Sequence, residues 1–157
     1  MHQIVKQSKL ISWIPVILWM ALIFYLSHQP ASSSNELSSG VMDVFLNAIT
    51  TVTSIDIDLG IFHHLIRKSA HFFAYFILGF LVINALKRHM PIKWKGVFLS
   101  LVICILYASS DEVHQLFILG RSGEVRDVFI DSTGSATGIT VYILLGKIFR
   151  KIYSHLS

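Results

Sequence analysis

The sequence has few charged residues. Asp, Glu, Lys and Arg together make up 14% of its 157 residues, whereas a soluble domain carries about 25%. Its one cysteine, Cys104, excludes an intramolecular disulfide scaffold, and its nine glycines and three prolines exclude a collagen-like chain. The hydrophobic content of 54% excludes a disordered chain. The composition therefore predicts a membrane protein.

Four apolar stretches are each close to the roughly 20 residues that a helix needs to cross a bilayer. They predict membrane helices at residues 10–27, 69–86, 94–110 and 128–149, and residues 111–115 can extend the third helix as an amphipathic end. The first stretch follows a basic leader, as a cleaved signal peptide would. Its apolar run is longer than that of a typical signal peptide and no clear cleavage site follows, so we interpret it as a membrane helix. The prediction is one all-α domain, residues 1–157, whose four transmembrane helices form a bundle.

The longest connection, residues 28–67, opens with a stretch rich in Ser, Pro, Asn and Gly that is typical of a loop. Farther along this connection, apolar residues recur at helical spacing and predict an amphipathic helix lying in the membrane interface. These residues are Val41, Val44, Phe45, Ala48, Ile49 and Val52.

The charges are distributed unevenly between the two ends of the predicted helices. If the N-terminus lies in the cytoplasm, nine of the thirteen basic residues also lie there, and all nine acidic residues lie outside. The nine basic residues are Lys6, Lys9, Lys87, Arg88, Lys93, Lys95, Lys147, Arg150 and Lys151. By the positive-inside rule, this predicts a multi-pass protein of the plasma membrane with both termini in the cytoplasm. The basic inner face suits anionic membrane lipids, so the net charge of +4 needs no nucleic-acid partner.

Polar residues gather at the predicted outer ends of the last three helices. Four in the second helix share one face, as do three in the third, with Glu112 turned aside. In the fourth, Asp127 and Asp131 share a face with Gly134 and Gly138, whose spacing lets another helix approach closely. A bundle that turns these faces inward has a polar cavity on the extracytoplasmic side. The candidate ligand-binding residues are Lys68, His71, Tyr75, Asp111, His114, Gln115, Arg121, Arg126, Asp127 and Asp131, and His64 lies on the same predicted face as Lys68.

Three segments carry a family pattern: IFYLSHQP at positions 23–30, RKSAHFFAYFILGF at 67–80 and SDEVHQLFILGRSGEVRDVFIDSTGSATG at 110–138. In these segments, their order and their spacing, the chain resembles the VanZ-like membrane proteins. The resemblance implies a contribution to antibiotic resistance of the teicoplanin (glycopeptide) type, or another cell-envelope function. It also implies that the family's motif positions are Lys68, His71, Tyr75, Asp111, Glu112, His114, Gln115, Arg121, Asp127 and Asp131.

Two classes of function fit the predicted cavity. In the first, it binds a membrane lipid headgroup, a lipid-linked envelope precursor or a lipoglycopeptide, with Lys68, Arg121 and Arg126 contacting an anionic group. In the second, it is a membrane enzyme acting on a lipid-linked substrate. The candidate catalytic residues are His71, Asp111, Glu112 and His114, with a histidine as general base and Asp111 as its orienter.

Three further expectations follow from the residue types. His71, Asp111 and His114 could supply a zinc-like set of ligands, but the tight ligand spacing of a metal site is lacking, so we expect no metal and no other cofactor. We expect Asp131 to pair with Lys68, Arg121 or Arg126, because an unpaired carboxylate inside the membrane is costly. His71 and Tyr75 can also be explained as interhelical hydrogen bonds that only hold the bundle together.

Overall fold

A computed structural model describes residues 9–30, 40 and 59–156. Its helices are α2 (Ile14–Ser27), α4 (Leu59–Leu86), α5 (Trp94–Gln115) and α6 (Val125–Leu156). Four segments, Lys9–Ser27, His64–Leu86, Trp94–Gln115 and Val125–Ser154, are long and apolar enough to cross a membrane. The predicted all-α fold with four membrane helices is confirmed. The predicted amphipathic helix, residues 41–52, lies outside the described residues.

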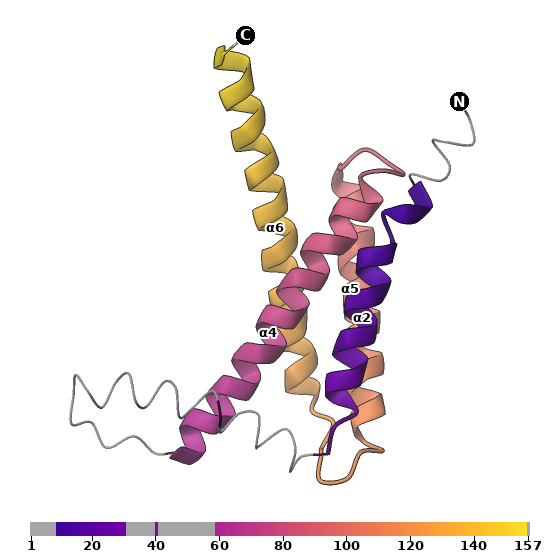
Figure 1. Ribbon diagram of the computed structural model, residues 1–157, viewed down its shortest axis with the longest axis vertical. Coiled ribbons are helices and arrows are strands. Elements are labelled where there is room, and N and C mark those ends of the chain that lie inside the picture. The colour runs from indigo at the N-terminus through magenta and orange to yellow at the C-terminus, as the bar shows by residue number, and fades with distance from the viewer. Residues whose placement is uncertain (1–8, 31–39, 41–58, 157) are drawn as a thin grey trace, which may run out of the picture.

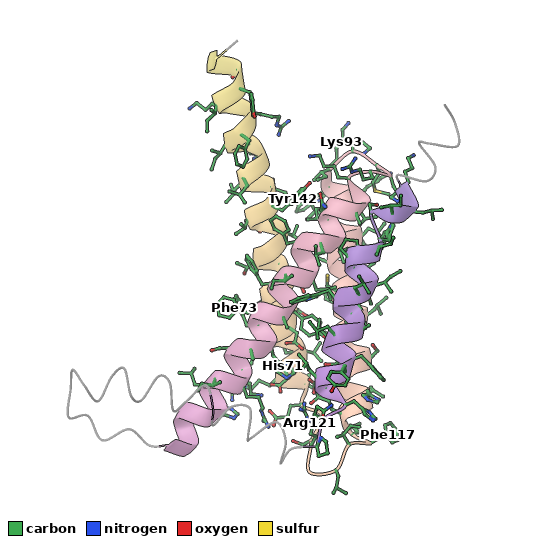
Figure 2. The ribbon with its side chains drawn as sticks, viewed as in Figure 1. His71, Phe73, Lys93, Phe117, Arg121 and Tyr142 are labelled. Atoms are coloured by element: carbon green, nitrogen blue, oxygen red, sulfur yellow. The ribbon has the colours of Figure 1, made fainter. Side chains whose placement is uncertain are left out.

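The helices run alternately up and down (Figure 1). The beginning of α2, the connection between α4 and α5, and the end of α6 lie at one end of the molecule, and the connection between α5 and α6 lies at the other. Lys93 marks the first end in Figure 2, and Arg121 marks the second. Both termini of the helical region therefore lie at the same end of the bundle, as four crossings require.

The closest helix packing is between α4 and α6, which cross and share the most extensive contact in the bundle (Figure 1). It depends on glycines, because a methyl group on Gly138 would overlap the carbonyl oxygen of Phe76, and one on Gly134 would overlap that of Phe72. A methyl group on Gly79 of α4 would likewise meet the backbone of α6. Small residues let membrane helices approach until their backbones touch. The close approach predicted for Gly134 and Gly138 is confirmed, and its partner is α4.

Two helices extend beyond the predicted spans. Helix α4 begins at Leu59 rather than residue 69, and α6 runs from Val125 to Leu156 rather than over 128–149. Helix α5 continues to Gln115, in agreement with the extension predicted over residues 111–115. The apolar stretches end where charged residues begin, but the helices continue past them because lysine, arginine and glutamate are themselves good helix formers. At the margin of the apolar region, Lys68 of α4 and Asp127 of α6 pair with each other.

The orientation in the membrane can be tested with single cysteines in a Cys104→Ser background. Ser122 and Lys93 are both exposed and lie in the connections at opposite ends of the bundle, so a difference in labelling reports the side of the membrane. In intact cells, a membrane-impermeant thiol reagent is expected to label Ser122→Cys and to leave Lys93→Cys unlabelled until the cells are permeabilised. The reverse pattern would show that the basic asymmetry does not set the orientation here.

Candidate functional site

Polar side chains of α4, α5 and α6 gather inside the bundle, near the end where the α5–α6 connection lies. Figure 2 shows His71 and Arg121 toward this end, whereas Phe73, on another face of α4, points away from the bundle. Most of these polar side chains are buried, and Asp131 and Tyr75 have no exposed surface. We call this set the polar cluster: Lys68, His71, Tyr75, Asp111, Glu112, Gln115, Asp127 and Asp131.

An ion pair joins α4 to the start of α6 at the edge of the polar cluster. The Lys68 ammonium contacts the carboxylate of Asp127 and lies 3.2 Å from the carboxylate of Glu124. The side chains of Lys68 and Asp127 are almost fully buried, so each charge depends on the other for stabilisation. Lys68, which the sequence offered as a contact for an anionic ligand, already has two carboxylate partners.

Asp131 pairs with a histidine rather than with a cation of the predicted set. Its Oδ1 lies 3.5 Å from Nδ1 of His71 on α4. Among the described residues, neither oxygen of Asp131 has a hydrogen-bond partner. The expected pairing with Lys68, Arg121 or Arg126 is wrong, because His71 is one turn deeper than Lys68 on the same face of α4, level with Asp131 on α6.

On α5, Asp111 is held by two donors and keeps one oxygen unused. Its Oδ2 accepts hydrogen bonds from the hydroxyl of Ser27 at 2.8 Å and from the side-chain amide of Gln115 at 3.4 Å. Its Oδ1 is buried and has no partner within the described part of the chain. Ser27 is the last residue of α2, so this aspartate connects the first membrane helix to the cluster.

Glu112 lies inside the cluster, not aside from it as its helical position suggested. It is 5% exposed, and its Oε2 accepts a hydrogen bond from the backbone N–H of Glu124 at 2.8 Å. The α5–α6 connection folds back over the end of α5 so closely that a methyl group on Gly123 would overlap the carbonyl oxygen of Glu112. This covering segment buries a carboxylate that would otherwise face water. Oε1 of Glu112 has no partner among the residues described.

His114 forms its hydrogen bond with His28 rather than with Asp111. The ring nitrogens of His28 and His114 lie 3.2 Å apart, and the two rings stack with centroids 5.3 Å apart. Phe24 of α2 stacks on His114 at 4.5 Å. The acid–base pair suggested for His114 and Asp111 is therefore replaced by a contact between α5 and the end of α2.

Arg121 ties the α5–α6 connection to the end of α2. Its Nε donates to the carbonyl of Gln29 at 2.9 Å, and its Nη2 donates to the carbonyl of Leu26 at 3.3 Å. Burial, and then the nearby Arg67, lower the pKa of Arg121 from its usual value, but a guanidinium remains charged in proteins. Arg126 is exposed and lies outside the polar cluster, as does the exposed His64.

Three partners in these contacts were missed by the sequence reasoning: Ser27, His28 and Glu124. The first two lie in the motif IFYLSHQP, and the third lies between Arg121 and Asp127 in the longest motif. Their signal was present in the motifs, but Ser27 and His28 lie at the end of the first membrane helix and Glu124 lies before the last one, so none of them belongs to a polar face of the last three helices.

One group in the polar cluster has the composition of a metal site. His71, Glu112 and Asp131 each offer one ligand atom, and these atoms all lie within 4.8 Å of one another. Each residue comes from a different helix, so the group exists only in the assembled bundle.

Comparison with known proteins finds one family whose model matches most of the chain. The VanZ/LLP1 family model matches residues 12–146, a range that contains every residue of the polar cluster. No curated protein and no solved structure shows a significant match to the chain.

Proposed function

The chain belongs to the VanZ/LLP1 family, and on that basis we propose that it binds the polar headgroup of a lipid, a lipid-linked envelope precursor or a lipoglycopeptide in its polar cluster. Binding of such a headgroup would give the protein its function in the cell envelope. The proposed biological role is a contribution to teicoplanin-type glycopeptide resistance or to another envelope function at the extracytoplasmic face of the plasma membrane.

The observation that carries this proposal is a set of five buried side-chain atoms without hydrogen-bond partners in the described part of the chain. They are the hydroxyl of Tyr75, Oδ1 of Asp111, Oε1 of Glu112 and both carboxylate oxygens of Asp131. Buried polar groups in proteins nearly always have partners, and leaving one without a partner costs about 1–3 kcal/mol, more when it is charged. A ligand that enters the cluster would supply the missing partners.

The chemistry of these atoms favours a ligand rich in hydrogen-bond donors. Four of the five are carboxylate oxygens, which accept hydrogen bonds when ionised. Lys68 and Arg121 already have carboxylate and carbonyl partners, so they are poorly placed to hold an anion. Hydroxyl, amide and ammonium groups fit the cluster better, and sugar and peptide headgroups carry many of them. The exposed Arg126 is available for a phosphate at the membrane surface.

Binding can be measured with purified protein in detergent and a lipid-linked disaccharide–peptide precursor. Asp131→Asn and Glu112→Gln keep side-chain volume but remove the charge that strengthens each hydrogen bond to the headgroup. Losing one such bond, about 1.5–3 kcal/mol, is expected to weaken binding roughly 10- to 150-fold. Native mass spectrometry gives the bound fraction, and thermal unfolding shows whether the variants remain folded.

The matched control is Thr133→Val on α6, because Thr133 is exposed and bonds only to its own helix in the contacts described. It should bind as the unmodified protein does. In a teicoplanin-susceptible host, Asp131→Asn and Glu112→Gln should give a lower inhibitory concentration of teicoplanin than the unmodified protein. Thr133→Val should give the same inhibitory concentration as the unmodified protein. Full binding by both Asp131→Asn and Glu112→Gln would leave the cluster as a structural feature of the bundle.

A second candidate function is a membrane enzyme, and the pairing of His71 with Asp131 favours it. A histidine oriented by a buried carboxylate is a common arrangement for a general base, and here Nδ1 of His71 faces Oδ1 of Asp131 at 3.5 Å. In this proposal the general base is His71, one of the two candidate histidines, and its orienter is Asp131 rather than Asp111. Conversion of the bound precursor into a product, lost in His71→Gln with binding retained, would distinguish the enzyme from the binding protein.

A further inference from the structure

The geometry of His71, Glu112 and Asp131 differs from that of a hydrogen-bonded network. The 3.5 Å between Nδ1 of His71 and Oδ1 of Asp131 is longer than a good hydrogen bond between charged groups, about 2.7–2.9 Å. It is close to the roughly 3.4 Å that separates two ligand atoms of one tetrahedral zinc ion, given metal–ligand distances of about 2.0–2.2 Å. One ligand atom from each of His71, Glu112 and Asp131 lies within 4.8 Å of the other two, so binding of one ion would draw the three side chains closer together.

An independent observation also indicates a cation at this position. Asp131 is completely buried, and both of its oxygens lack hydrogen-bond partners among the residues that the structure describes. Oε1 of Glu112 is buried and unpartnered in the same way. Two carboxylates in a buried membrane site need compensating charge. The neighbouring cation Lys68 is already committed to Asp127 and Glu124.

A divalent ion matches this charge. Its two positive charges balance the carboxylates of Glu112 and Asp131, the two that belong to this group, and leave His71 neutral, which is the form in which imidazole binds metals. A site made only of oxygens would suit Mg²⁺ or Ca²⁺, whereas an imidazole ligand shifts the preference toward zinc and related transition metals. Three protein ligands also leave a fourth position for water or for a ligand oxygen.

We infer that His71, Glu112 and Asp131 together form a binding site for one divalent transition-metal ion of the zinc class. The site connects α4, α5 and α6 inside the membrane region, so the ion would stabilise the assembled bundle as well as the cluster. The ion would take the free oxygens of Glu112 and Asp131, and the hydroxyl of Tyr75 and Oδ1 of Asp111 would remain for a headgroup. All three metal ligands come from the protein, so the inference can be tested without any headgroup.

Zinc binding can be measured on the full chain, purified in detergent with a tag that lacks histidine and then stripped with a chelator. Titration with Zn²⁺ alone, followed by metal analysis, is expected to give one tightly bound ion per chain. Asp131→Asn should weaken binding by more than about 100-fold, since even outer-shell partners of metal ligands are worth 10- to 100-fold. His89→Gln is the matched control, because His89 bonds to Trp13 at the opposite end of the bundle and should leave zinc binding unchanged.

A spectroscopic measurement keeps the inference testable if a variant fails to fold. X-ray absorption of the zinc-loaded protein should show one imidazole nitrogen with oxygen ligands. Two imidazole ligands, or zinc that is lost in His28→Gln but kept in Asp131→Asn, would assign the ion to the His28–His114 pair and overturn the inference. Absence of bound zinc at micromolar concentration in the unmodified protein would also overturn it, leaving protons to neutralise the carboxylates.

Discussion

Gly138→Ala is expected to remove most of the folded protein from the membrane. The added methyl group would overlap the carbonyl oxygen of Phe76 on α4, and the obstacle is backbone, which cannot rotate away as a side chain can. Relief would require α4 and α6 to separate along the most extensive helix contact in the bundle. Overpacking of a well-packed core costs about 1–3 kcal/mol and sometimes more, and here a cost above about 3 kcal/mol is expected because two backbones collide.

Protein abundance in membranes and thermal unfolding in detergent measure this effect. Gly146→Ala provides the matched control, since Gly146 lies two turns farther along α6 and a methyl group there would meet nothing within 4 Å. Its abundance and melting temperature should equal those of the unmodified protein or rise slightly, because alanine favours a helix over glycine. Equal abundance and stability of the Gly138→Ala and Gly146→Ala proteins would contradict the close approach of α4 and α6.

Lys68→Met should destabilise the protein by about 3–5 kcal/mol, the usual cost of leaving one member of a buried ion pair without its partner. Asp127 is buried, and its side chain would lose the cation that it contacts. The double variant Lys68→Met/Asp127→Asn removes both charges and should recover much of the lost stability. Unfolding of the four proteins in this cycle gives the coupling energy between the two residues.

Lys147→Met on α6 is the control for the loss of a lysine, because Lys147 is exposed and should contribute little. If Lys68→Met is as stable as Lys147→Met, the pair with Asp127 contributes nothing to folding. Lys68 would then be available for the role that its sequence position first suggested, contact with an anionic ligand.

The membrane helices could be predicted from the sequence because hydropathy is a local property. Each predicted apolar stretch lies within one of the four segments that are long and apolar enough to cross a membrane. The close helix approach at Gly134 and Gly138 followed from their spacing alone. Helix ends were predicted less well. A charged residue such as Lys68 ends an apolar stretch but does not end the helix, because lysine is a good helix former.

The sequence predicted most of the residues in the polar cluster, but it did not predict which of them contact one another. Helical spacing places Lys68, His71 and Tyr75 on one face, and that information lies within α4. The contacts between these side chains depend on how far α4 is shifted along its axis relative to α6. The residue pattern within a single helix gives no information on that shift. Glu112 shows the same limit, since its burial comes from a connection that folds back over it, and spacing along α5 cannot show this.

The attachment of α2 has a consequence for how the bundle assembles. Helix α2 is held by individual side-chain bonds: from Trp19 to the carbonyl of Ala74 at 2.8 Å, from Tyr107 to the carbonyl of Met20 at 2.6 Å, and from Ser27 to Asp111. All of these partners belong to segments synthesised later. Helix α2 is therefore synthesised before these partners, and its largely exposed apolar side chains can face lipid until the partners are made. We expect α4 and α6 to pair first through their glycines, so that α2, which precedes both in the chain, docks last.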